Sequence, residues 1–217
     1  MFDEPGRLSA LNGVVEPGTY GRKIAGGPGI TLRERPNLSI IQVAAYADTA
    51  EKTMTVIQSL VGALPPPEPN RSVMVDSIQI CWIGPHKWWI IETDQRHRAE
   101  SIASRLGIGA AVTTQGHGRS CIRLSGPSAR DLLPKGCTLD FHPSRFSAGH
   151  CAQTNLGHAN TLINCIDDEP IFDLFVLRSY AVSFWEWITD AAGEFGYRVS
   201  PSTERFIEPT RQSTEDS

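Results

Sequence analysis

The order of its strand and helix patterns is the feature that most restricts how this chain folds. A β-branched-rich run at residues 38–46 predicts a buried strand. Asp48, with Glu51 three residues later, is a typical helix start, and apolar residues then recur at helical spacing. The first unit is thus expected to contain a strand at 38–46, a helix between Asp48 and Gly62, a hairpin of strands 77–83 and 88–92, and a helix between Asp94 and Gly107.

The second part of the chain repeats this order. Residues 119–125 alternate in polarity as a half-exposed strand does, and Pro127 suits the first turn of a short helix. The expected elements are a strand at 119–125, a helix from Pro127 to Gly136, strands at 151–156, 161–166 and 171–177, and a helix at 180–195. This succession of strands and helices predicts the α+β fold class.

The two ends of the chain differ from its middle. Residues 1–29 are rich in glycine and proline, which predicts an extended N-terminal arm without a core of its own. Residues 198–217 form a polar tail that we expect to be flexible. Residues 30–197 are then a single domain, with halves at roughly 30–113 and 114–197.

Composition excludes several classes of partner. Apolar residues make up 40% of the chain, charged residues 20%, and the formal net charge is −4, which is typical of a soluble globular protein. The 20 Lys and Arg residues are scattered among 24 acidic ones, which argues against nucleic acid binding. The N-terminus lacks the pattern of a secretory signal, and no segment approaches the roughly 20 apolar residues of a membrane span. Because the five cysteines are also unclustered, we expect a cytoplasmic protein without a membrane partner.

A metal site is the first chemical possibility in this sequence. Six thiol and imidazole side chains fall within 29 residues: Cys137, His142, His150, Cys151, His158 and Cys165. Zinc ligands usually come in close pairs such as Cys-x-x-Cys or His-x-x-x-His, and none of these pairs occurs here. Buried thiols and surface or hydrogen-bonded imidazoles explain the residues better, so no metal site is predicted.

Other chemical motifs are incomplete as well. Cys137, Asp140 and His142 could form a nucleophile with its base, but catalytic Cys-His pairs are usually distant in sequence. Cys137 also follows a predicted helix end, where the helix dipole disfavours a thiolate. The glycine clusters at 26–29 and 116–118 complete neither a dinucleotide-binding motif nor a Walker loop. The sequence therefore predicts no catalytic and no cofactor-binding residue.

Tryptophans occur in pairs along the chain. Adjacent strand residues face opposite sides, so Trp88 and Trp89 cannot both enter one core, and Trp185 and Trp187 are about 200° apart on a helix. Either a member of each pair lies at a subunit interface, or it fills a second internal layer between the two halves. Candidates for polar contacts with a partner, for which strand-face and helix-end roles serve about as well, are Arg119, Arg123, Lys135, His142 and Arg178.

Several blocks of the sequence resemble one known family in their order and spacing. The longest block is Leu124-Ser-Gly-Pro-Ser-Ala-Arg-Asp-Leu-Leu-Pro-Lys-Gly-Cys-Thr-Leu-Asp-Phe-His-Pro143, and the others include Trp82-Ile-Gly-Pro85, Trp88-Trp-Ile-Ile91 and Phe184-Trp-Glu-Trp187. Over roughly residues 30–197 the chain resembles the gamma subunit of heterotetrameric sarcosine oxidase, a family related in fold to the aminomethyltransferase of the glycine cleavage system. The resemblance implies two ferredoxin-like strand-helix-hairpin-helix halves packed as one pseudo-duplicated body, similar to the folate-binding aminomethyltransferase fold.

The resemblance also implies a role without chemistry of its own. In such a complex the alpha subunit binds NAD and carries a tetrahydrofolate site, the beta subunit binds FAD, FMN lies between alpha and beta, and the delta subunit holds zinc. The complex oxidatively demethylates sarcosine to glycine, with hydrogen peroxide and methylenetetrahydrofolate as products. The gamma subunit is implied to bind none of these cofactors and to stabilise alpha, its chief partner beside beta and delta.

Two alternative functions stay open. Subunits of related oxidases and dehydrogenases of N-methylated amino acids, such as N-methylglutamate dehydrogenase, share such segments, and relatives often have an Asp-Val-Ser-Asp-like run where this chain has Thr113-Thr-Gln-Gly116. A stand-alone folate-dependent one-carbon transferase or folate-binding protein of the same fold is the second alternative. The acidic cluster at 167–169 precedes Pro170 and is interpreted as a turn between strands.

Overall fold

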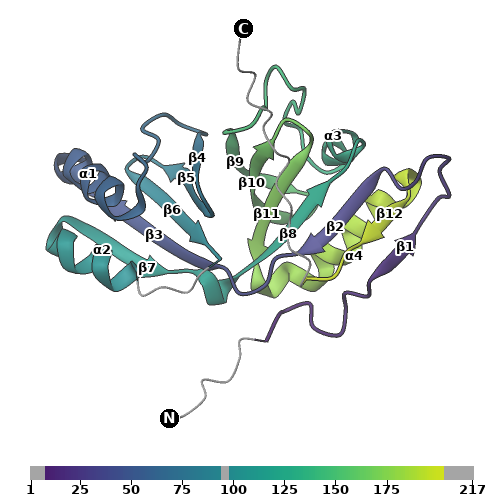
Figure 1. The fold of residues 1–217 in the computed structure, drawn as a ribbon, viewed down its shortest axis with the longest axis horizontal. Coiled ribbons are helices and arrows are strands. Elements are labelled where there is room, and N and C mark those ends of the chain that lie inside the picture. The colour runs from purple at the N-terminus through teal and green to yellow at the C-terminus, as the bar shows by residue number, and fades with distance from the viewer. Residues whose placement is uncertain (1–7, 94–97, 203–217) are drawn as a thin grey trace, which may run out of the picture.

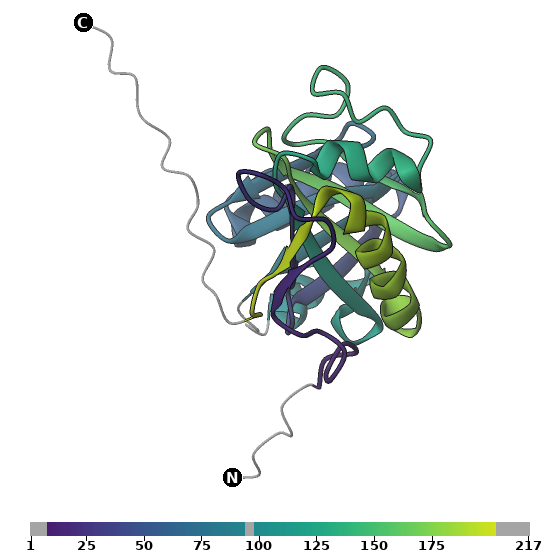
Figure 2. The same ribbon diagram turned by 90° about the vertical axis from the view of Figure 1, so that its right-hand side faces the viewer.

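Two β-sheets pack face to face in the computed structural model, which describes residues 8–93 and 98–202 (Figure 1). Helices α1 (Ala50–Val61) and α2 (Arg98–Leu106) lie on the outer face of one sheet, and α3 (Ala129–Leu132) and α4 (Ala181–Ala192) lie on that of the other. Figure 2 shows α4 in front of its sheet, beside strand β12 (Tyr197–Val199). The layers therefore follow the order helix, sheet, sheet, helix.

The smaller sheet has five strands in the order β4-β5-β6-β3-β7. They are β3 (Ser39–Ala45), β4 (Ser72–Val75), β5 (Ile78–Gly84), β6 (Lys87–Glu92) and β7 (Ala110–Thr114). Neighbouring strands are antiparallel, and β5 and β6 form the hairpin expected from the sequence. Ile57 of α1 and Ile102 of α2 pack against Ile41 and Ile90 of this sheet, because both helices carry apolar residues at helical spacing.

The larger sheet has seven strands in the order β1-β12-β2-β8-β11-β10-β9. Besides β12 they are β1 (Gly18–Tyr20), β2 (Ile30–Glu34), β8 (Arg119–Ser125), β9 (Cys151–Leu156), β10 (Ala159–Asp167) and β11 (Ile171–Leu177). Strand β12 is parallel to β2, and the other neighbouring strands are antiparallel. Phe184 and Ile188 of α4 enter the core of this sheet with Ile122 and Leu174.

Short 3-10 helices lie at the ends of several elements. They are η1 (Ala47–Thr49), η2 (Gly107–Gly109), η3 (Gly116–Gly118), η4 (Leu133–Lys135), η5 (Arg178–Tyr180) and η6 (Gly193–Phe195). Gly62 and Gly107, which the sequence predicts to end α1 and α2, have φ angles of 92° and 54°. Glycine adopts this left-handed conformation without the steric cost that a side chain would add.

The two sheets share much of their strand order. In the smaller sheet β5, β6 and β3 are neighbours, and in the larger sheet β10, β11 and β8 are neighbours in the same succession. Strand β7 lies next to β3 in the first case, whereas β2 is inserted between β8 and β12 in the second. The α+β fold class predicted from the sequence is confirmed.

Both ends of the described chain contribute to the larger sheet. Within the predicted arm, β1 pairs with β12 and Leu11 is buried in the core beneath this sheet, so the arm packs on its own chain. Arg198 and Val199, expected at the start of a flexible tail, belong to β12. The tail beyond residue 202 and the expected start of α2 at residues 94–97 lie outside the described residues.

Candidate subunit-contact site

The first tryptophan pair is buried inside this chain. Trp88 is 2% exposed and Trp89 is 4% exposed. Trp88 packs on the helix side of the smaller sheet and donates its indole N–H to the carbonyl oxygen of Pro66 at 2.8 Å. Trp89 lies on the opposite face, between the two sheets, with its ring edge against Phe175. The expectation that one of them is exposed at a subunit interface is therefore wrong, and Trp89 fills a second internal layer.

The second tryptophan pair serves the packing of α4. Trp185 is buried in the core of the larger sheet, and Trp187 is half-buried beside it. The Trp187 ring lies against Gly136 and Gly157, where an added Cβ atom on Gly157 would be 2.8 Å from Trp187 Cδ2. The amide of Gly157 donates to the carbonyl oxygen of Gly136 at 2.8 Å, which holds the two glycines together under the ring. Both indoles thus fasten α4 to its own sheet.

Arg123 is enclosed within the chain rather than placed on its surface. Its guanidinium binds Asp173 with two hydrogen bonds, Nε to Oδ1 at 2.7 Å and Nη2 to Oδ2 at 2.9 Å. Arg35 Nη1 reaches Asp173 Oδ2 at 2.5 Å, and Gln79 Nε2 donates to the same oxygen at 3.1 Å. Asp173 is fully buried and Arg123 is 7% exposed, so a role for Arg123 as a surface contact is corrected to one inside the fold.

The charge state of Asp173 follows from this arrangement. Burial by itself favours the neutral acid and would raise the pKa of Asp173, but the positive charges of Arg35 and Arg123 and their hydrogen bonds outweigh that effect. The pKa of Asp173 therefore lies well below its ordinary value. A carboxylate held in this state is a poor base at neutral pH, and its negative charge compensates the two guanidinium charges.

A chain of polar side chains continues from Asp173 across both sheets. Gln79 of β5 accepts a hydrogen bond from Asn164 Nδ2 of β10 at 3.2 Å, and Ser72 of β4 donates to Asn164 Oδ1 at 2.6 Å. Each buried amide therefore meets a partner from the opposite sheet, and Trp89 belongs to an apolar cluster with residues of both sheets. Satisfied polar contacts of this kind fix one alignment of two layers, because any other alignment leaves buried groups unpaired.

Lys135 and His142 lie apart from this network. Lys135 Nζ donates to the carbonyl oxygen of Ala191 at 2.8 Å and pairs with Glu194 at 3.0 Å, so it binds the C-terminal end of α4, where a cation is favoured. His142 is exposed, and its Nδ1 lies 2.8 Å from Ser144 Oγ. Both side chains are accessible in part, and contact of either with a partner stays a prediction.

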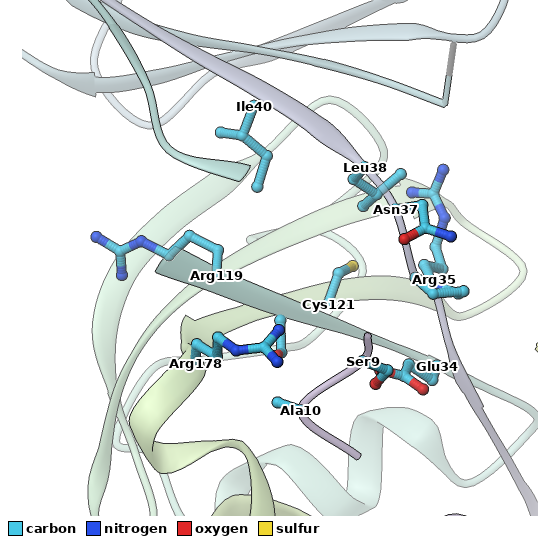
Figure 3. A pocket seen from close by; sticks show the side chains of 12 residues that line it. Ser9, Ala10, Glu34, Arg35, Asn37, Leu38, Ile40, Arg119, Cys121 and Arg178 are labelled. Carbon is cyan, nitrogen blue, oxygen red and sulfur yellow. The ribbon is translucent and has the colours of Figure 1, made fainter. Parts of the chain in front are cut away.

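The structure brings Arg119 and Arg178 together at one crevice (Figure 3). The crevice has a volume of about 20 Å³, which suffices for a water molecule but not for a cofactor. The Arg119 guanidinium carbon lies 4.9 Å from the centre of the Trp89 ring, a distance typical of a cation–π contact. Arg178 Nη2 donates to the carbonyl oxygen of Leu8 at 2.8 Å, and Ser9 and Ala10 line the crevice on the same side (Figure 3).

Exposed apolar residues flank Arg178 in the sequence, and its hydrogen bond to Leu8 brings one more of them to the same segment. We name this group the η5 patch, and its members are Leu8, Leu177, Arg178, Tyr180 and Val182. Exposed apolar side chains beside a guanidinium are typical of a protein-contact surface. Sequence reasoning found Arg178 but missed the others, although an apolar residue at the exposed end of a strand, followed by a tyrosine before a helix, is a signal that could have indicated them.

The thiols and acids singled out in the sequence are engaged in local structure. The five cysteines are buried, and burial raises the pKa of Cys165 to about 11, which disfavours a reactive thiolate. The cluster at 167–169 is a turn between β10 and β11, in which the Glu169 amide donates to Asp167 at 3.0 Å. In residues 8–93 and 98–202, no group of three or more His, Cys, Asp or Glu side chains is placed to hold a metal ion.

Comparison with solved structures defines the fold first. The fold is that of a glycine cleavage aminomethyltransferase: the enzyme from Bartonella henselae matches with a TM-score of 0.56 at 12% identity over 81% of this chain and 48% of that one. A heterotetrameric sarcosine oxidase from Corynebacterium sp. U-96, in complex with pyrrole 2-carboxylate, matches with a TM-score of 0.72 at 21% identity, over 85% of this chain and 91% of that one.

Sequence comparison then identifies the family. The model of the sarcosine oxidase, gamma subunit family matches residues 46–194, and the chain belongs to this family. Sarcosine oxidase subunit gamma of Corynebacterium sp. (strain U-96) is 24% identical over 174 residues, which cover 80% of this chain and 84% of the relative. The corresponding subunit of Corynebacterium sp. (strain P-1) is 26% identical over 151 residues, covering 69% and 70%. The resemblance drawn from the sequence blocks is thereby confirmed.

The length and apolar character of the helices were compared with what a membrane span requires. None of those between residues 8 and 93 or between 98 and 202 is both long enough and apolar enough to cross a bilayer.

Proposed function

We propose that this chain is a non-catalytic gamma subunit of a heterotetrameric sarcosine oxidase and that it stabilises the alpha subunit of that complex. The observation that carries this proposal is the division of its side chains between two tasks. Asp173, Arg123 and Gln79 are enclosed and hold the two sheets together, whereas the η5 patch leaves apolar side chains exposed beside Arg178. A surface of this composition suits contact with another protein.

The chemistry of the complex belongs to its other subunits in this proposal. FAD, FMN, NAD, tetrahydrofolate and zinc are then held by alpha, beta and delta, and these cofactors carry out the oxidation of sarcosine and the transfer of the one-carbon unit. The contribution of this chain is interface area on alpha. Membership of the gamma subunit family supports this assignment.

We further infer that the two halves of the fold derive from one duplicated unit. The shared succession of β5, β6 and β3 in one sheet and β10, β11 and β8 in the other supports this inference. In each half a helix follows the first of these strands along the chain, a hairpin comes next, and a second helix follows the hairpin. The insertion of β2 between β8 and β12 is the main departure from equivalence.

Co-expression with the partner subunits tests the proposed role. We expect that omission of this chain lowers the yield of folded alpha subunit and that the isolated chain forms no hydrogen peroxide from sarcosine. Tyr180→Asp, which places a charge in the η5 patch, should reduce recovery of the complex, because a desolvated unpaired carboxylate opposes association. Leu64→Asp is the matched control, because Leu64 is an equally exposed apolar residue after α1.

Two results would contradict the proposal. Sarcosine-dependent peroxide formation by the isolated chain would assign it catalysis. Tight binding of tetrahydrofolate by the isolated chain, without recruitment of alpha, would favour a stand-alone folate-dependent transferase instead. Recovery of a dehydrogenase that acts on another N-methylated amino acid would preserve the scaffold role and change the substrate.

A further inference from the structure

Within residues 8–93 and 98–202, no strand covers the outer edge of β7. It forms the end of the five-stranded order and pairs only with β3 among the described strands. Exposed edges are usually protected by charged residues, proline or bulges, because their free backbone groups pair readily with another chain. The ten residues from Gly107 to Gly116 contain none of Asp, Glu, Lys, Arg or Pro, so this edge lacks the usual protection.

The direction of the backbone groups of β7 follows from its register. The amide of Gln115 donates to the carbonyl oxygen of Ile40 at 2.7 Å, and the pairing continues with Gln42 opposite Thr113 and Ala44 opposite Ala111. In an antiparallel ladder, hydrogen-bonded pairs alternate with pairs whose backbone groups point away. The remaining backbone groups of the strand therefore point outward, and they belong to Ala110, Val112 and Thr114.

The other sheet edges in residues 8–93 and 98–202 are short or covered. Strand β1 has three residues. The edges of β4 and β9 meet each other, because the Cys151 amide donates to the Asn70 carbonyl oxygen at 2.9 Å and the Ser72 amide donates to that of Gly149 at 2.8 Å. An isolated bridge between Arg71 and His150 joins them further. The five-residue edge of β7 has no such neighbour within the described part of the chain.

The surroundings of this edge also suit a protein partner. Ile108, just before β7, is 98% exposed, and Tyr46, at the end of β3, is 64% exposed. Thr49 Oγ1 donates to the carbonyl oxygen of Gly109 at 2.6 Å, which holds these two segments side by side. At its other end β7 leads through Gln115 into η3, which contacts η5. The β7 edge therefore leads along the chain to a segment beside η5.

We propose that an extended segment of the alpha subunit adds to the five-stranded sheet as a strand beside β7. This inference rests on the proposed function and names the mode of contact. Backbone hydrogen bonds to Ala110, Val112 and Thr114 supply the ladder, and Ile108 packs against an apolar side chain of the added strand. An uncharged edge fits an uncharged strand of the partner, because a charge placed there would lose its water without gaining a counterion.

A proline substitution tests the edge without disturbing the rest of the sheet. Thr114→Pro removes an N–H that points outward, and Thr114 is exposed, so the isolated chain should keep its fold. We expect recovery of the alpha complex to fall about tenfold or more, because a buried acceptor of the partner loses its donor. Thr114→Val keeps the N–H and should bind as the native chain does. Thr113→Pro removes an N–H that faces β3 and should instead lower the melting temperature.

Hydrogen exchange gives a second measurement that needs no variant. The amides of residues 110, 112 and 114 should exchange rapidly in the isolated chain and become protected in the assembled complex. Normal recovery of alpha with Thr114→Pro, or unchanged exchange in the complex, would overturn the inference while leaving the proposed function intact. Failure of the native chain itself to recover alpha would overturn the proposed function. If these amides become protected when the concentration of this chain alone is raised, a second copy of the chain pairs with the β7 edge. That result would also overturn the inference.

Discussion

Asp173 and Arg123 show how much depends on single side chains in this protein. They stand directly opposite each other on β11 and β8, and the carboxylate is shared with Arg35 from the segment after β2. The compensation is mutual, since two guanidinium groups lose their counterion if the acid is removed. Because the loss of hydration on burial opposes much of the attraction between the charges, the ion pairs add little net stability. Their main effect is to favour this one alignment of the strands.

We predict that Asp173→Asn destabilises the chain by about 3–5 kcal/mol, because it leaves buried guanidinium charges uncompensated. Urea denaturation at pH 7 measures the change in the free energy of unfolding. Glu169→Gln, at an exposed acid of the following turn, is the control and should change stability by less than about 0.5 kcal/mol. Equal effects of the two substitutions would contradict the structural role of Asp173.

The same carboxylate predicts the pH dependence of stability. The pKa of Asp173 is lowered in the folded state, so the unfolded state takes up its proton first as the pH falls. The stabilisation by Asp173 is therefore complete above the unfolded pKa of about 4 and is lost progressively below it. Comparison of denaturation curves between pH 5 and pH 3 should show a steeper loss for the native chain than for Asp173→Asn.

At the scale of elements, α4 is held in place by the Trp187 ring, which packs against the backbone of two glycines. Trp187 reaches across to Gly136 and Gly157, and both positions are too close to the ring to accept a Cβ atom. Gly136 does not have a positive φ angle, so an alanine there tests the close approach alone. The position of α4 in turn fixes η5 and the exposed residues around Arg178.

We predict that Gly136→Ala costs about 1–3 kcal/mol of stability by overpacking against Trp187 and the Gly157 backbone. Gly118→Ala is the control, because an added Cβ atom there meets nothing within 4 Å. Thermal and chemical denaturation measure both. Combination of Gly136→Ala with Trp187→Ala should cost less than the sum of the two single substitutions, since the overlap with the ring is then removed and only that with the Gly157 amide nitrogen is left. Strict additivity would show that the strain lies elsewhere.

Elements with a complete local pattern could be predicted from the sequence. The bounds of β8, β9 and β11 agree with the expected ones, because each has a run long enough to show its period. Strands β4 and β12 were missed, since four and three residues are too few for a pattern. Strand β2 was missed because it directly follows the glycine- and proline-rich segment, although its burial alternates clearly.

The candidate site is harder to predict from the sequence, because it depends on strand register and on contacts between residues that are distant in the sequence. Arg123 was a candidate for the surface, and only the pairing of β8 with β11 shows that Asp173 faces it. The sequence pattern allows Trp89 to lie on the surface, whereas the packing of the second sheet buries it. Arg119 and Arg178 meet because the start of β8 and the end of β11 are opposite each other in the sheet.

At the scale of the whole molecule, the predicted halves are interleaved. Strand β2 comes from the first half of the chain, yet it lies between β8 and β12 of the second. The inner faces of both sheets also share an apolar cluster that contains Trp89 and Phe175. Neither half can therefore bury its apolar surface alone, and we expect the two sheets to unfold together.

We predict that residues 1–113 and 114–217, produced separately, each lack a cooperative thermal transition. Mixed or co-expressed fragments should associate and regain one, because β2 can then insert between β8 and β12. Circular dichroism during heating measures both, and calorimetry of the intact chain should give a single transition. A fragment 1–113 that melts cooperatively on its own would show that the smaller sheet is an independent domain.

The connection between the two sheets has a consequence for the lifetime of the free subunit. Four residues, Arg35 to Leu38, separate β2 in one sheet from β3 in the other. An extended chain advances about 3.3–3.6 Å per residue, so this connection keeps the joined strand ends within about 18 Å even when the sheets separate. The entropic cost of closure stays small for so short a loop. Re-closure within one molecule therefore competes well with capture by a neighbouring molecule, which limits aggregation of copies that have not yet met their partner.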